Sequence, residues 1–225
     1  MGFLMGFLFW QSFGNVKFTI YNLQLILNFQ FSILVFELLS KIFFIVILAA
    51  LFITDLRKML IPDRIILPSL KIGFIVLLSL TIYKVGYLYY FLSQSNIGKF
   101  LLPPRSDYFL RHALLTANPL LTGILMALII GAFFWGLIVL TKGKGMGGGD
   151  VKLGAFIGLM LGFPLSLLAI ILSFITGAIF SVGLLVSGKK KFGQIIPFGP
   201  FLVLGSLISL FWGDKIIEWY LHLSL

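Results

Sequence analysis

The chain has 225 residues, of which 60% are hydrophobic and 11% are charged, and its formal net charge is +10. A soluble domain carries about 25% charged residues, so this inventory cannot cover a water-facing surface, and lipid must be the main solvent. The absence of cysteine excludes disulfides and cysteine-bound zinc, and a metal site built on the two histidines is not expected.

Apolar runs bounded by charge, proline and glycine predict an all-α, polytopic membrane helix bundle. A backbone in lipid must satisfy its own hydrogen bonds, which leaves helices or a closed barrel. The runs Ile42–Ile53 and Leu120–Leu140 lack the alternation of barrel strands. We expect about six to eight transmembrane helices in a single membrane-embedded domain over residues 1–225. The expected helices are 2–27, 33–53, 65–83, 118–141, 151–167, 169–187 and 196–212.

Three short segments rich in Lys and Arg set the expected orientation: 57–64, 142–152 and 189–191. Helix counting puts all three on one side, and the positive-inside rule makes that side cytoplasmic. The connection 84–119 then lies outside and could hold a surface helix. The direction of the first helix follows only from parity, because Lys17 interrupts it. The net positive charge is therefore interpreted as the excess of Lys and Arg that multi-spanning membrane proteins carry in their cytoplasmic loops. No nucleic-acid partner is expected.

A charged acidic side chain is energetically unfavourable within a membrane segment, so the position of each acidic residue needs an explanation. The full set is Glu37, Asp55, Asp63, Asp107, Asp150, Asp214 and Glu218. Most have an ordinary interpretation, such as a solvated charge, a helical pair from Glu37 to Lys41, or a helix cap at Asp63. Asp55 follows an apolar run directly, and it is either a surface acid paired with a neighbouring base or a functional residue.

Asp150 ends the segment Gly145-Met146-Gly147-Gly148-Gly149-Asp150. It could cap the helix that begins near Val151. Four glycines in the preceding five residues are costly in chain entropy, and they are worthwhile where the backbone passes close to a neighbouring helix or to an extended substrate. A phosphate loop is a weak rival because the Gly-Lys-Ser/Thr ending is missing. Helix counting places Asp55 and Asp150 on the same membrane face, but does not show that they meet.

Three blocks in this order resemble the type IV prepilin leader peptidases, a family of GxGD membrane aspartic proteases. Residues 145–153 resemble the GxGD signature, in which the aspartate is catalytic and a Lys-Leu pair follows. Residues 55–63, with Asp-Leu and Ile-Pro-Asp, resemble the second aspartate motif, and 196–202 resemble a third block. The resemblance implies that Asp55 and Asp150 are catalytic. Residues expected to bind substrate or shape the site are Pro62, Asp63, Gly145, Gly147, Gly148, Gly149 and Lys152.

The resemblance also implies a substrate and a location. Substrates would be type IV prepilins or pseudopilins with a short basic leader, cut on the cytoplasmic side of the inner membrane after a Gly that precedes a hydrophobic helix. Two close carboxyl groups sharing one proton can activate water for this hydrolysis without a cofactor. Lys152 either holds the charge of the site or faces lipid headgroups. The oligomeric state is left open.

The chain departs from the family in one region. Bacterial members carry a cytoplasmic loop with two Cys-x-x-Cys pairs that bind zinc, and we expect this loop to be absent. The loop is associated with N-methylation of the new N-terminus, so S-adenosylmethionine would be needed only if that second activity is retained. Two alternatives remain: another GxGD protease, such as a preflagellin-peptidase-like enzyme, or a non-enzymatic transporter or assembly scaffold.

Overall fold

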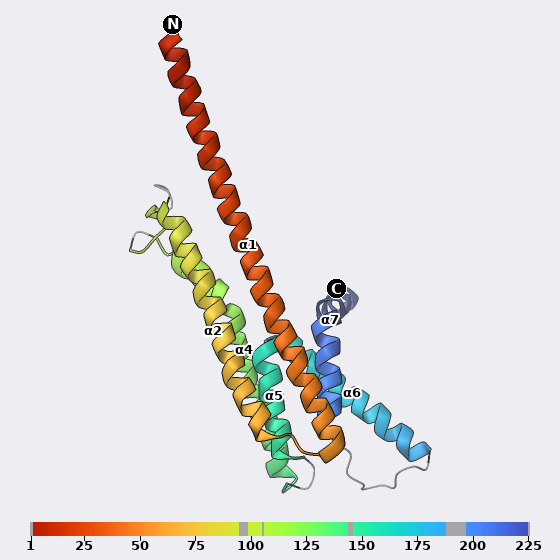
Figure 1. Cartoon of the computed structure of the whole chain (residues 1–225). Helices are drawn as coiled ribbons and strands as arrows, with labels where there is room; N and C mark the ends of the chain where they lie inside the picture. Colours follow the sequence, from red (N-terminus) through yellow and green to blue (C-terminus); the bar gives the residue numbers. More distant parts are fainter. Residues whose placement is uncertain (1, 95–98, 105, 144–145, 188–196, 225) are drawn as a thin grey trace. The chain divides into compact units, whose positions relative to one another are not determined.

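A computed structural model describes the backbone of residues 2–94, 99–104, 106–143, 146–187 and 197–224, and the side chains of these ranges apart from 2–28, 58 and 223–224. Within these ranges the chain is helical and has no strand. Its helices are α1 (Gly2–Lys58), α2 (Asp63–Gln94), α4 (Tyr108–Leu140), α5 (Gly148–Leu161), α6 (Leu165–Val186) and α7 (Gly199–Ser224) (Figure 1).

Five stretches of the described chain are long and apolar enough to cross a membrane. They are Phe29–Arg57, α2, α4, α6 and Gly199–His222. Helix α5 is not among them, because it has only 14 residues. The expectation of a polytopic membrane helix bundle is therefore confirmed.

The chain divides into two compact units, Met1–Lys41 and Ile42–Leu225. The first unit consists of the N-terminal part of α1. The second unit contains the end of α1 and all the other helices, and it includes every described residue of the candidate site.

Helix α1 is continuous where the apolar pattern predicts two helices, 2–27 and 33–53. The residues between them include neither proline nor glycine, so only polar side chains could interrupt the helix. Ser32 Oγ instead donates to the carbonyl of Phe29 at 2.8 Å, which satisfies the hydroxyl inside the helix. The predicted break between helices 151–167 and 169–187 is placed too late in the chain. Helix α5 already ends at Leu161, and α6 begins at Leu165, just after Pro164.

The outer connection is shorter than the predicted segment 84–119. Helix α2 continues to Gln94 and α4 begins at Tyr108, so helices take up much of that segment. Pro119, which was placed at a helix start, lies inside α4.

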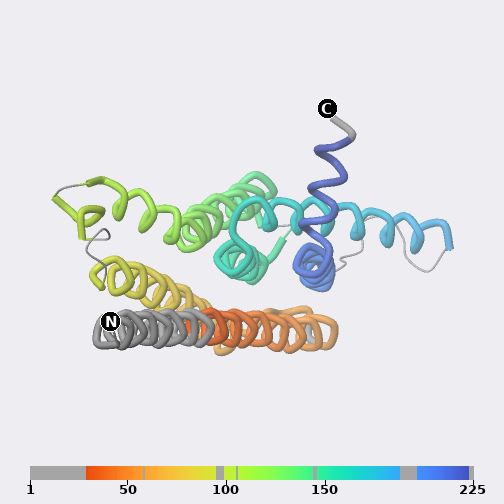
Figure 2. Tube along the Cα trace, turned by 90° about the horizontal axis from the view of Figure 1, so that it is seen from above, coloured from red at the N-terminus to blue at the C-terminus, as the bar shows by residue number. Residues whose placement is uncertain are grey.

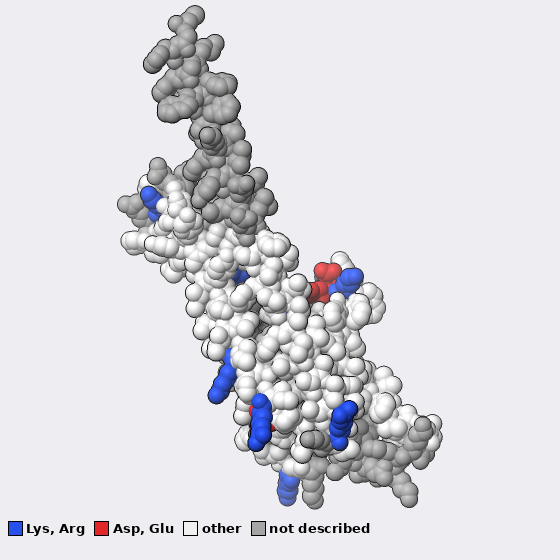
Figure 3. Space-filling model, viewed as in Figure 1, with Lys and Arg blue, Asp and Glu red and all other residues white. Residues whose placement is uncertain are grey.

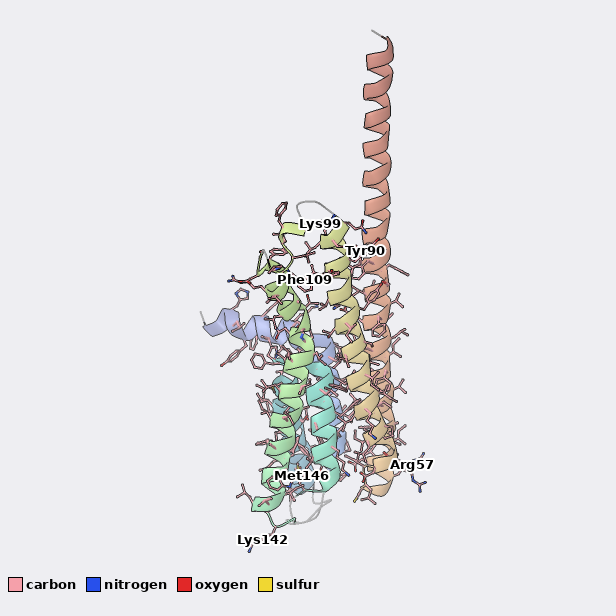
Figure 4. The ribbon with its side chains drawn as sticks, turned by 90° about the vertical axis from the view of Figure 1, so that its left-hand side faces the viewer. Arg57, Tyr90, Lys99, Phe109, Lys142 and Met146 are labelled. Carbon is pink, nitrogen blue, oxygen red and sulfur yellow. The ribbon has the colours of Figure 1, made fainter. Side chains whose placement is uncertain are left out.

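The described basic segments gather at one end of the second unit, as helix counting predicts. Arg57 and Lys142 both lie toward this end, on opposite sides of the view, and Lys99 lies toward the opposite end (Figure 4). The space-filling view shows basic side chains at the same lower end (Figure 3). The third basic segment, Lys189–Lys191, lies outside the described residues.

Helix α5 lies at the centre of the second unit. It packs mainly against α4, while α6 packs mainly against α7 (Figure 2). Phe156 of α5 is fully buried, and its ring centroid lies 5.4 Å from that of Phe44 of α1. Ile130 and Phe134 of α4 join the same core. This packing fixes the start of α5, where Asp150 lies.

The close contact between α4 and α5 depends on Gly158. A Cβ atom at this position would lie 2.7 Å from the backbone of Met126 and Ala127, which cannot move aside easily. We expect Gly158→Ala to lower the free energy of unfolding by about 1–3 kcal/mol. Circular dichroism during an SDS titration of the detergent-solubilised protein measures this change.

Gly136→Ala on α4 is the matched control, because nothing lies within 4 Å of a Cβ atom there. Alanine favours a helix over glycine by up to about 1 kcal/mol, so this variant should be as stable as the wild type or slightly more stable. Equal stability of both variants would show that α4 and α5 are not held in close contact.

Candidate active site

Asp55 lies in the last turn of α1, which closes as the N–H of Met59 donates to the Asp55 carbonyl at 2.8 Å. Its side chain is 5% exposed. Oδ2 is buried and has no hydrogen-bond partner among the described residues. A buried carboxyl oxygen without a partner is unfavourable for stability, so this position suggests a functional role.

The N-terminus of α7 packs directly on Asp55. Gly199 begins this helix, and Pro200 occupies the first turn, where its missing N–H is tolerated. A Cβ atom on Gly199 would collide with Asp55 Oδ2. The Gly199 N–H also lies near this carboxyl group, although Oδ2 itself accepts no hydrogen bond from the described residues. Gly199 was not among the expected site residues; its place in the third sequence block, 196–202, was the available signal.

Asp150 lies in the first turn of α5 and is 9% exposed. Its backbone N–H donates to the carbonyl of Gly147 at 3.1 Å, which closes the turn. Burial and then the negative charge of Asp55 raise the pKa of Asp150 to about 6. The structure therefore brings Asp55 and Asp150, which lie far apart in the sequence, within electrostatic range of each other.

The glycine segment before Asp150 has two kinds of position. A Cβ atom on Gly149 would lie 2.8 Å from Cβ of Ile61, so glycine here lets the 55–63 segment pack beside the start of α5. Gly147 and Gly148 have open space where a Cβ atom would lie. The backbone of these two residues, just before Asp150, is therefore accessible. Gly145 lies outside the described residues.

Pro62 and Asp63 form the start of α2. The carbonyl of Pro62 accepts the N–H groups of Ile65 and Ile66 at 3.0 and 3.2 Å. Asp63 Oδ1 pairs with Lys152 Nζ at 2.5 Å. This ion pair links the beginnings of α2 and α5. Both side chains are substantially exposed, so the pair contributes less than about 1 kcal/mol to stability.

The structure thus connects the three sequence blocks at one end of the helices. Asp55 comes from the first block and Asp150 from the second, while Gly199 comes from the third. Lys152 has a partner in Asp63, an arrangement that neither sequence-based interpretation of this lysine included.

Comparisons with known proteins identify the family of the chain. The model of the type IV leader peptidase family matches residues 42–182. The chain belongs to this family. It is 33% identical to a prepilin leader peptidase/N-methyltransferase of Aeromonas salmonicida over 78% of the chain and 50% of that protein. A protein of the same name from Bacillus subtilis is 29% identical over 84% of the chain and 62% of its own length.

The chain spans about half the length of the Aeromonas relatives it matches. No solved structure matches the chain. The family assignment covers both candidate aspartates and the glycine segment, because positions 55, 63 and 145–153 all lie inside the matched range. The third block, 196–202, lies beyond it.

The names of these relatives include an N-methyltransferase, a reaction that needs a methyl donor such as S-adenosylmethionine. A cavity of about 410 Å³ lies between α4, α6 and α7, and among the described residues no charged side chain lines it. The donor carries an ammonium, a carboxylate and a sulfonium group, which need charged or strongly polar partners. The described residues of this cavity do not fit that molecule.

Proposed function

We propose that this protein is a membrane aspartic endopeptidase that removes the short basic leader of type IV prepilins or pseudopilins. Its residues form a single membrane-embedded peptidase domain, with Asp55 and Asp150 as the catalytic carboxyl groups. The main supporting observation is that two buried carboxyl groups from separate sequence blocks interact electrostatically, in a chain that belongs to the leader peptidase family.

The chemistry follows from the charge state of the pair. Two nearby carboxylates repel each other, so the pair retains one proton where isolated carboxyl groups would lose both. The ionised partner accepts a proton from water, whose oxygen attacks the peptide carbonyl carbon. The protonated partner donates to the carbonyl oxygen, and a proton then reaches the amine nitrogen as the C–N bond breaks. Water is thereby added across the bond, and the pair recovers its starting state.

The site is proposed to face the cytoplasm of the cell's inner membrane. The support is that Asp55 and Asp150 lie at the end of the helices that carries Arg57 and Lys142 (Figure 4), which the positive-inside rule assigns to the cytoplasmic side. A substrate whose hydrophobic helix lies in the bilayer can reach this site by lateral diffusion.

The neighbouring residues are proposed to shape the site. The open backbone at Gly147 and Gly148 leaves room for an extended peptide beside Asp150, and Gly145 precedes them in the sequence. Pro62, Asp63 and Lys152 hold the starts of α2 and α5 together through the helix turn and the ion pair. These residues position the dyad and do not exchange protons with the substrate.

Cleavage by the purified full chain tests this function. The protein is reconstituted in nanodiscs with anionic lipid and mixed with synthetic prepilins that carry a basic leader and a Gly before the hydrophobic helix. Mass spectrometry should show a single cut after the Gly. A matched prepilin with a bulky residue in place of that Gly is the control and should remain uncut. Absence of cleavage across several prepilins would contradict the proposal.

The rate of cleavage should depend on pH with a definite sign. Because the pKa of Asp150 is raised to about 6, the proton that the pair shares is present below this value and is lost as the pH rises through it. We expect kcat to fall about tenfold per pH unit well above that pKa. Single-turnover cleavage between pH 5 and 9 measures this, and a flat profile would contradict the assignment of the shared proton.

A further inference from the structure

The last part of helix α7 has two chemically different sides. Its polar side chains recur at helical spacing on one side: Asp214, Lys215, Glu218 and His222. Large apolar and aromatic side chains share the other side: Trp212, Ile216, Trp219 and Tyr220. Trp219 and Tyr220 are 65% and 66% exposed. This part of α7 is therefore an amphipathic helix whose aromatic side is exposed.

The same part of α7 changes direction. Helix α7 first runs along its neighbours and then turns across them toward its C-terminal end (Figures 2 and 4). Ser209 Oγ donates to the carbonyl of Leu165, the first residue of α6, at 2.7 Å. A Cβ atom on Gly213 would lie 2.5 Å from Cδ2 of Leu165. Gly213 is buried and Asp214 directly after it is exposed, so the packing of α7 against α6 ends at this point.

This point lies at a definite height above the candidate site. Gly199 begins α7 and faces Asp55, and a helix from Gly199 to Gly213 rises about 21 Å. An amphipathic helix at a membrane surface buries its apolar side about 5–10 Å into the boundary between headgroups and acyl chains. The two lengths together match a hydrocarbon core, which is about 30 Å thick. The turn of α7 therefore lies near the surface of the leaflet opposite the candidate site.

The charges on this part of α7 favour the same location. Asp214, Lys215 and Glu218 are exposed, and Figure 3 shows acidic and basic side chains together at this end of α7. Charged side chains are energetically unfavourable among acyl chains, whereas an exposed aromatic side is unfavourable in water. The membrane interface offers both environments, and Trp and Tyr are enriched there.

We propose that residues 212–222 form an interfacial anchor that binds the lipid surface of the leaflet opposite the candidate site. Trp219 and Tyr220 insert at the level where acyl chains meet headgroups, and the polar side faces headgroups and water. The polar side carries two acids and one lysine, so attraction to anionic lipid does not drive binding, and neutral phospholipid is sufficient. Because α7 is one helix, the anchor also sets the depth of Gly199 beside Asp55.

Tryptophan fluorescence of the full chain in proteoliposomes tests the anchor. Trp10→Phe, Trp135→Phe and Trp212→Phe together leave Trp219 as the sole tryptophan. The vesicles are neutral phosphatidylcholine with bromine, which quenches tryptophan on contact, placed either near the headgroup end of the acyl chains or near their tips. We expect Trp219 to lose more fluorescence when the bromine lies near the headgroups. Circular dichroism confirms that the variant is folded.

Leu128→Trp, in a chain that also carries Trp219→Phe and the other three replacements, is the matched control. Leu128 is 67% exposed on α4. It lies between Leu140, where α4 ends, and Gly123, which packs against Leu159 near the end of α5. A tryptophan at this position lies among the acyl chains, so it should lose more fluorescence when the bromine lies near the chain tips.

Three results would overturn the anchor. If Trp219 responds to bromine as the Leu128→Trp control does, the segment crosses the acyl chains. If acrylamide in water quenches Trp219 and brominated lipid does not, the segment lies in water. If neither quenches it, protein covers the aromatic side, as in a dimer of two copies. These measurements use no substrate, so a failure of the proposed peptidase function leaves their interpretation unchanged.

Discussion

Asp55→Asn and Asp150→Asn should each lower prepilin cleavage by about 10²–10⁴-fold or more, because each removes one half of the proton exchange. Asparagine keeps the size and shape of aspartate but can neither hold a proton for the carbonyl oxygen nor accept one from water. Both positions are buried, and neither substitution introduces a larger side chain. Loss of activity should therefore occur without loss of helical structure, and single-turnover cleavage combined with circular dichroism measures both.

Asp107→Asn is the matched control for this change. Asp107 precedes α4, is exposed and makes no side-chain cap hydrogen bond, so the same substitution there should leave cleavage unchanged.

Asp150→Glu distinguishes a protease from a non-enzymatic scaffold or an ion-conducting protein. It keeps the charge but moves the carboxyl group by roughly 1 Å, which can lower a reaction rate about 100-fold. Normal cleavage by any of the three dyad variants would remove that residue from the mechanism.

The two aspartates could be predicted from the sequence because the constraints on them are local. Each acid follows a segment whose composition is unusual, an apolar run before Asp55 and a glycine cluster before Asp150. Counting helices places both acids at the same end, since each connection reverses the chain direction. Their interaction across helices could not be derived this way, because it depends on how α1, α5 and α7 pack.

Contacts between distant segments account for the residues that the sequence did not identify. Gly199 resembles any glycine at a helix start until its contact with Asp55 is known. The pairing of Lys152 with Asp63 likewise requires the starts of α2 and α5 to lie side by side. Helix boundaries were missed where the stop signals are weak, as between 27 and 33, where polar side chains occur without proline or glycine.

Gly199→Ala should lower kcat by about 100-fold, since a displacement of the catalytic group by roughly 1 Å is sufficient for such a loss. The added Cβ atom would occupy the space of Asp55 Oδ2, so either the carboxyl group or the start of α7 must move. The change adds one methyl group and removes no charged or hydrogen-bonding group. KM should change much less than kcat, because Gly199 contacts the catalytic carboxyl group.

Gly183→Ala provides the matched control, because the same methyl group there meets no atom within 4 Å. Cleavage and thermal unfolding of both variants are measured in the same detergent. A loss of kcat in Gly199→Ala with unfolding close to that of the wild type would locate the effect at Asp55. A parallel loss of stability and cleavage would indicate that the start of α7 is displaced as a whole. Unchanged kcat would mean that the Asp55 carboxyl group tolerates the displacement, which is incompatible with a dyad that depends on the close approach of two carboxyl groups.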